Sequence, residues 1–109
     1  MLTYQKAEEI YSAIQSTKLT ELKNTLIKKA IRYAHIRSEW QFLSIEDRAS
    51  QDADRTAAHN TFIDSCNILS RNMIKAGEDI TWRTTLTNDR KIIGDFACFV
   101  HAFIGLNNR

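Results

Sequence analysis

The chain has 109 residues, of which 43% are hydrophobic and 26% are charged, and this balance excludes an intrinsically disordered protein. Its net charge of +2 is too small by itself to indicate a nucleic-acid or anionic-membrane partner. We expect residues 1–109 to form a single domain, because this length is typical of one hydrophobic core. With no proline and only three glycines, the chain lacks the commonest helix breakers, and an all-α fold is predicted.

The first predicted helix spans about 3–16. Thr3 is a plausible N-cap, and Ala7, Ile10 and Ile14 recur at helical spacing on one face. The residues before and within this helix are polar after a few positions, unlike the apolar core of a secretion signal. We therefore expect a cytoplasmic protein.

A second helix is predicted from Thr20 to about Leu43. Arg37 falls inside its apolar stripe, where a buried guanidinium needs a carboxylate partner. Asp64 and Asp95 are the candidates, because each is flanked by core positions. An internal ion pair is the expected role of Arg37, and the alternative is a side chain that reaches the surface.

The stretch from Lys18 to Arg37 is locally basic, with six basic residues against one acidic residue. On its outward side it would present four cations that could sit against phosphates, namely Lys18, Lys28, Lys29 and Arg32. The stretch lacks interleaved aromatic residues, so a solvated helix face is the preferred interpretation and nucleic-acid binding the alternative.

A long third helix is predicted from Ser44 toward Ala76, and Gly77 is a natural left-handed C-cap. The sequence leaves open whether this helix is continuous or broken near Ser50. Its core stripe continues toward the N-terminal half as a polar row on the same face, made of Arg48, Asp52, Arg55 and His59.

Three interpretations of this polar row remain open. Arg48 and Asp52 could form an ion pair one turn apart, while Arg55 and His59 reach a neighbouring helix. The row could instead bind a partner protein or a small ligand, or serve as an enzyme site built on Asp52, Arg55 and His59. A structural role, through these ion-pair and helix contacts or with this end of the helix simply projecting into water, is the preferred interpretation.

Between the third and last helices, apolar residues alternate in 78–87, which favours an extended segment. We expect one longer loop here, or a strand that pairs with a second copy of the chain, and Trp82 is then a candidate interface residue.

Asn88 or Asp89 should cap a last helix that reaches about Leu106 and is hydrophobic over a broad arc, so that it lies at the centre of the fold. Its other side carries small residues that let a second backbone approach closely, namely Gly94, Cys98, Ala102 and Gly105. Packing within the chain is the preferred interpretation, and a homodimer contact is the alternative.

The overall prediction is a four-helix bundle with the C-terminal helix central. No phosphate-binding glycine loop, serine hydrolase elbow or Glu-x-x-His pair occurs, and the two cysteines, Cys66 and Cys98, should be reduced thiols. We expect no catalytic residue, metal or cofactor, and no membrane association. The leading hypothesis is a non-enzymatic interaction or regulatory module that binds itself, as a homodimer, or another protein.

Overall fold

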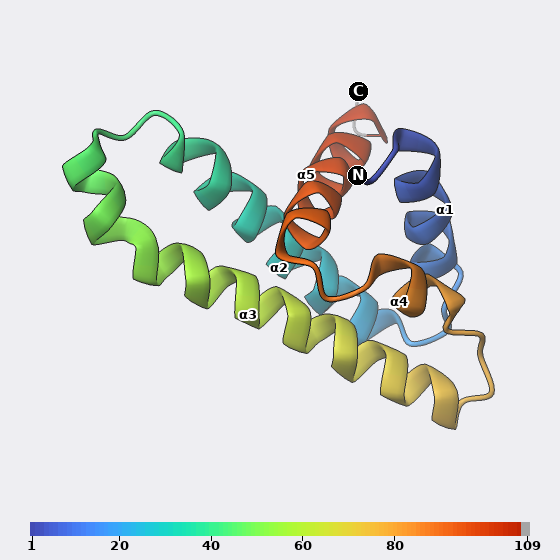
Figure 1. Cartoon of the computed structure of the whole chain (residues 1–109). Helices are drawn as coiled ribbons and strands as arrows, with labels where there is room; N and C mark the ends of the chain where they lie inside the picture. The colour runs from blue at the N-terminus through green and yellow to red at the C-terminus, as the bar shows by residue number, and fades with distance from the viewer. Residues whose placement is uncertain (108–109) are drawn as a thin grey trace.

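The computed structural model describes residues 1–107, which form five α-helices joined by short turns (Figure 1). The helices are α1 (Tyr4–Gln15), α2 (Thr20–Trp40), α3 (Ile45–Lys75), α4 (Thr81–Leu86) and α5 (Arg90–Asn107). Residues 1–107 contain no β-strand. The predicted all-α class is therefore confirmed, although the number of helices is five rather than four.

The predicted boundaries of α1 and α3 are confirmed by their caps. Thr3 Oγ1 accepts a hydrogen bond from Lys6 N at 3.2 Å, and Ser44 Oγ accepts one from Asp47 N at 3.1 Å. Each bond satisfies a backbone donor that the first turn of a helix leaves free. Helix α3 then continues unbroken through Ser50 to Lys75.

Gly77 ends α3 in the left-handed conformation, with φ of 77°. The N–H of Glu78 donates to the carbonyl of Met73 at 2.8 Å, and the N–H of Gly77 donates to that of Ile74 at 3.0 Å. These two bonds are the pair that closes a Schellman motif. The predicted glycine C-cap is confirmed.

The predicted loop or strand at 78–87 is wrong, because residues 81–86 form helix α4. Trp82 and Leu86 are four residues apart, a spacing that also places both on one face of a helix, and both are buried. Asp79 starts the helix by accepting hydrogen bonds from the backbone N–H and the hydroxyl of Thr81. The alternating pattern was therefore compatible with a short helix.

Helix α5 lies at the centre of the fold and contacts each of the other four helices. Its side chains at Ile93, Phe96, Ala97 and Val100 are fully buried. They belong to one connected apolar cluster that also draws on α1, α2, α3 and α4. Among the helices of residues 1–107, none is both long enough and apolar enough to cross a membrane.

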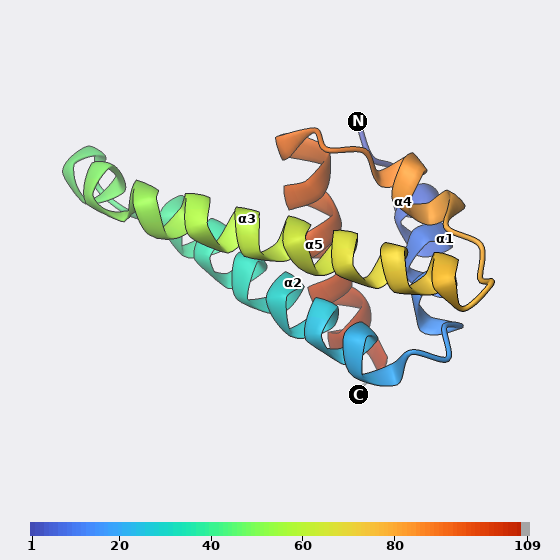
Figure 2. The ribbon, with the colours of Figure 1, turned by 90° about the horizontal axis from the view of Figure 1, so that it is seen from below.

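Helices α2 and α3 form an antiparallel hairpin whose far end projects beyond the other helices (Figures 1 and 2). Helices α1, α4 and α5 pack against the hairpin between its base and Arg37 and leave its far end uncovered, and the molecule is accordingly elongated, with extents of 47 × 29 × 25 Å. The projecting end contains the turn between the two helices and the N-terminal half of the predicted polar row.

Candidate partner-binding surface

The hairpin tip, residues 40–45, exposes two large hydrophobic side chains. Phe42 is 88% exposed and Ile45 is 84% exposed. Backbone bonds hold the turn between them: the N–H of Phe42 donates to Glu39 O at 3.0 Å and the N–H of Leu43 donates to Trp40 O at 3.3 Å. The two side chains are thus exposed to solvent on a turn whose backbone is held by hydrogen bonds to the end of α2.

Trp40 packs against two arginines of α3. The Cζ atom of Arg48 is 4.7 Å from the centroid of the indole, and that of Arg55 is 4.3 Å from it. Both distances are within the range of a cation–π interaction, which is worth about 0.5–1 kcal/mol at an exposed site. The indole is therefore held in one orientation beside the exposed Phe42.

Arg48 also closes the C-terminal end of α2. Its Nη2 donates to the carbonyl of Gln41 at 2.9 Å, and its Nε donates to that of Trp40 at 3.3 Å. A cation is favoured here because the last carbonyls of a helix carry partial negative charge. Within residues 1–107 no ion pair joins Arg48 to Asp52, so that predicted pair is wrong and the guanidinium binds carbonyls instead.

A groove of about 310 Å³ runs beside the hairpin tip between α2 and α3. Apolar side chains of Ile36, Trp40 and Leu43 line it together with polar and charged groups of both signs. The polar lining residues are Arg32, Glu39, Gln51 and Asp54. This composition suits an apolar group that enters between polar walls.

Two donors of the same region are buried without a hydrogen-bond partner, the Nε1 of Trp40 and the Nε of Arg55. A buried polar atom left unpaired costs free energy. His59, one turn further along α3, is 8% exposed, packs edge-on against Tyr33 of α2 at 5.5 Å between ring centroids, and leaves its Nε2 unpaired. Arg55 and His59 thus both reach the neighbouring helix.

The three residues of the predicted ligand or enzyme site, on consecutive turns of α3, have different surroundings. Asp52 is exposed, Arg55 covers Trp40, and His59 lies against Tyr33. The neighbouring groove is lined by Gln51 and Asp54 rather than by any of the three.

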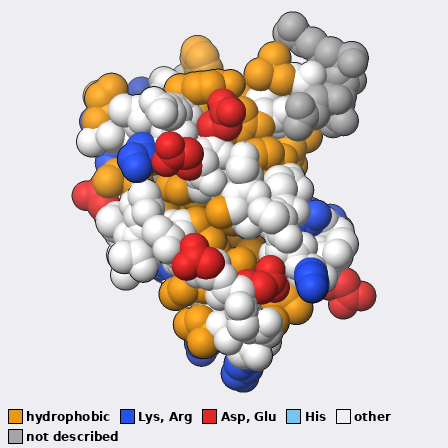
Figure 3. Space-filling view, turned by 90° about the vertical axis from the view of Figure 1, so that its right-hand side faces the viewer, with side chains coloured by type: hydrophobic (Ala, Val, Ile, Leu, Met, Phe, Trp, Pro, Cys, Tyr) orange, Lys and Arg blue, Asp and Glu red, His pale blue; other side chains and the backbone are white. Residues whose placement is uncertain are grey.

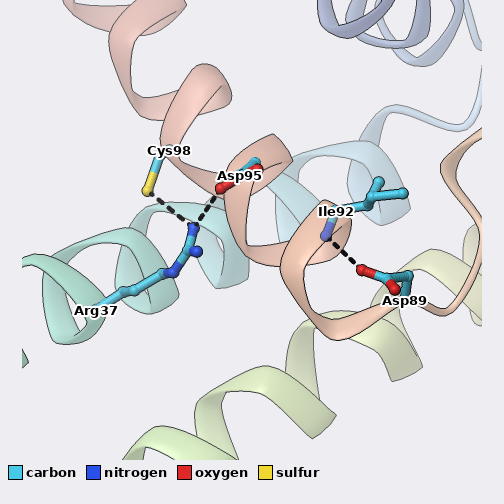
Figure 4. Close-up of polar contacts among 5 residues, drawn as sticks. All are labelled: Arg37, Asp89, Ile92, Asp95 and Cys98. Atoms are coloured by element: carbon cyan, nitrogen blue, oxygen red, sulfur yellow. Dashed lines mark hydrogen bonds and ion pairs between the residues drawn. The ribbon is translucent and has the colours of Figure 1, made fainter. Parts of the chain in front are cut away.

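The predicted ion pair of Arg37 is formed with Asp95, whose Oδ1 accepts from Arg37 Nη1 at 3.0 Å (Figure 4). The same nitrogen is 3.9 Å from the sulfur of Cys98. Desolvation by burial lowers the pKa of Arg37, but the hydrogen bond to Asp95 and the proximity of Cys98 outweigh it, so the pKa is raised above its ordinary value. Asp64, the other candidate partner, is exposed on α3.

The predicted interface residues of α5 lie in three different environments. Gly94 is buried under Arg37, Cys98 is half-buried, and Ala102 and Gly105 are exposed. Cys98 and Ala102 line a mostly apolar groove of about 410 Å³ together with Met1, Leu2, Asp95 and Phe99. Trp82 is 3% exposed and packs in the core, so it is not available as an interface residue of the folded chain.

The end of the molecule away from the hairpin tip carries hydrophobic side chains interspersed with charged ones (Figure 3). Tyr4, on α1, is 54% exposed but packs edge-on against Phe99 and Phe103. Phe42 and Ile45 are both much more exposed. The hairpin tip is therefore the stronger candidate for a partner-binding surface.

Of the predicted cationic surface, Lys18, Lys28 and Arg32 are exposed, and Lys29 is half-buried. Within residues 1–107 the ion pairs are Lys6–Glu9 and Arg37–Asp95, so these four cations have no acidic partner there.

Sequence reasoning did not identify Trp40, Phe42 and Ile45 as a site. A signal was present, because Phe42, Leu43 and Ile45 put apolar residues into a helix–helix junction, where polar turn residues are usual. What the sequence could not supply was the position of this junction, at the free end of a projecting hairpin.

No known protein family, curated protein or solved structure matches the chain.

Proposed function

We propose that this chain is a non-enzymatic protein-interaction module that self-associates through the hairpin tip. The observation that carries the proposal is the exposure of Phe42 and Ile45, at 88% and 84%, on a projecting turn. Single exposed apolar residues are common, but two neighbouring ones beside a partly apolar groove form a patch of the kind that binds proteins.

The packing of Arg48 and Arg55 against the indole of Trp40 supports this role. Tryptophan and arginine are the residue types most enriched among the energetically dominant positions of protein interfaces. Arg48 and Arg55, two turns apart on one face of α3, both pack against the indole, so little side-chain freedom is lost when a partner covers it.

A second copy of the chain is the partner that this surface fits best. The hairpin tip provides both a projecting group, Phe42, and a groove lined by Ile36, Trp40 and Leu43. In a two-fold symmetric pair, each copy would insert its projecting group into the groove of the other, so every contact is made twice. Arg32 of one copy can pair across such an axis with Glu39 or Asp54 of the other. The net charge of +2 adds little repulsion between copies.

In this proposal the four longer helices, α1, α2, α3 and α5, form a bundle with α5 at its centre. Contacts with α5 hold the α2–α3 hairpin in place, and helices α1, α4 and α5 leave its tip free to approach a second molecule (Figure 1).

The test is analytical ultracentrifugation over a range of concentrations, comparing wild type with the double variant Phe42→Ser/Ile45→Ser. We expect wild type to associate with increasing concentration and the double variant to remain monomeric. Ile74→Ser is the matched control, because Ile74 is also an exposed isoleucine of α3, at 58%, but lies at the base of the hairpin. Equal association of wild type and the double variant would contradict the proposal.

Nucleic-acid association through Lys18, Lys28, Lys29 and Arg32 is the alternative function, supported by the lack of acidic partners for these cations in residues 1–107. Addition of a short DNA duplex to the same experiment separates the two. Co-sedimentation that disappears as salt rises, and that Lys28→Ala/Arg32→Ala abolishes, would favour nucleic acid.

A further inference from the structure

His35 and His101 meet on the surface where α2 and α5 pack together. Their Nε2 atoms are 3.0 Å apart, and the ring centroids are 4.8 Å apart with an angle of 71° between the planes. Both side chains are exposed, so an ion in solution reaches the two nitrogens without any opening of the fold. The sequence predicts no metal site, but it places the three histidines on three different helices, so spacing along the chain does not exclude one.

We propose that His35 and His101 form a two-ligand site for a divalent transition-metal ion, of the Zn²⁺, Ni²⁺ or Cu²⁺ type. Neutral imidazole is a preferred ligand of these ions. Two nitrogens bound at 2.0–2.1 Å in adjacent positions of a square or octahedral ion are about 2.8–3.0 Å apart, and about 3.3–3.4 Å apart on a tetrahedral ion. The observed 3.0 Å fits the first arrangement and needs a shift of a few tenths of an ångström for the second.

The helix packing preorganises the pair. Arg37, two residues after His35 on α2, donates to Asp95, six residues before His101 on α5, at 3.0 Å. This contact fixes the register of the two helices next to the histidines (Figure 4). Binding requires the loss of the hydrogen bond between the imidazoles and a rotation of the rings that turns both Nε2 atoms toward one ion, with the two helices already in register.

The pair supplies two ligands to the ion. Within residues 1–107, no group of three or more His, Cys, Asp or Glu side chains is placed to hold a metal. The remaining coordination positions are open to water or to an external ligand. Hard ions such as Mg²⁺ and Ca²⁺, which prefer oxygen ligands, should not bind.

The test is isothermal titration calorimetry of Ni²⁺ and Zn²⁺ into the tag-free full chain at neutral pH, with Mg²⁺ as the negative control. We expect one ion per chain, and a loss of affinity of about tenfold or more in both His35→Ala and His101→Ala. The double variant should be no weaker than either single variant, because one histidine alone does not make the site. Cys98→Ala should bind like wild type, which distinguishes the pair from a thiol site.

Nuclear magnetic resonance of the imidazole ring protons provides a second measurement. The signals of His35 and His101 should change together as Zn²⁺ is added, while those of the buried His59 remain in place. Wild-type affinity in either single variant, or an affinity of wild type equal to that of the double variant, would overturn the proposal. Circular dichroism serves as the folding control. Both histidine variants should be folded, because the two positions are exposed on the surface.

Discussion

The guanidinium of Arg37 lies so close to Gly94 that a Cβ atom at residue 94 would be 2.8 Å from Arg37 Cζ. Glycine in a helix interior costs about 1 kcal/mol relative to alanine. Here the missing side chain makes the space in which Arg37 reaches Asp95 at 3.0 Å. The first member of the predicted small-residue strip thus serves packing within the chain.

A double-mutant cycle tests this relationship. In wild type, Gly94→Ala should be neutral or destabilising, because the added methyl group displaces the guanidinium and offsets the gain in helix propensity. In the Arg37→Ala background the same substitution should stabilise by up to about 1 kcal/mol. Urea unfolding gives the four free energies. An equal effect of Gly94→Ala in both backgrounds would mean that the two residues are not coupled.

Asp95→Ala should destabilise the fold by about 1–3 kcal/mol, because it leaves the mostly buried charge of Arg37 without its partner. Asp52→Ala is the matched control, since Asp52 is exposed and makes no ion pair within residues 1–107; its effect should stay within about 0.5 kcal/mol. Chemical denaturation measures both. Similar effects of the two substitutions would show that the ion pair contributes nothing specific.

Cys66 makes stability depend on alkaline pH. Burial raises the pKa of its thiol from an ordinary 9.0 to about 12, against smaller lowering effects of Arg83 and Ser65. The folded state therefore keeps a proton that the unfolded state loses, so this contribution is complete below pH 9 and is lost as the pH rises toward 12. Between pH 8 and 10.5, wild type should lose stability more steeply than Cys66→Ala. Parallel pH profiles of the two proteins would contradict this assignment.

Gly77→Ala should destabilise by about 1 kcal/mol, because φ of 77° is unfavourable for a residue with a Cβ atom. Nothing lies within 4 Å of the position of that Cβ, so the loss would come from the backbone alone. Gly77→Asn should recover part of the loss, since asparagine tolerates this conformation better. Thermal unfolding distinguishes these cases, and a fully stable Gly77→Ala would argue against the left-handed C-cap.

Much of the fold could be predicted from local patterns. Residue type and spacing predict the caps at Thr3 and Ser44, the C-cap at Gly77 and the apolar arc of α5. All four are found in the structure. Segment 78–87 was mispredicted because Trp82 and Leu86 satisfy both an alternating and a helical pattern over so few residues. Long-range packing selected the helix there by burying both side chains.

The candidate sites depend on distances between helices, which spacing along one helix does not contain. Arg48 was correctly placed on the polar row, but its partners are carbonyls at the end of α2 rather than Asp52 one turn away. His35 and His101 are 66 positions apart in the sequence, and only the packing of α5 on α2 brings them together. The Arg37–Asp95 pair was predictable because a charge within an apolar stripe requires a nearby opposite charge.

The most direct test of self-association through the hairpin tip is isotope-filtered nuclear Overhauser spectroscopy on an equal mixture of labelled and unlabelled chains. The proposal predicts intermolecular contacts between the ring of Phe42 in one copy and Ile36, Trp40 or Leu43 in the other. Intermolecular contacts confined to the groove around Phe99 and Ala102, or a chain that stays monomeric at the concentrations used, would contradict it.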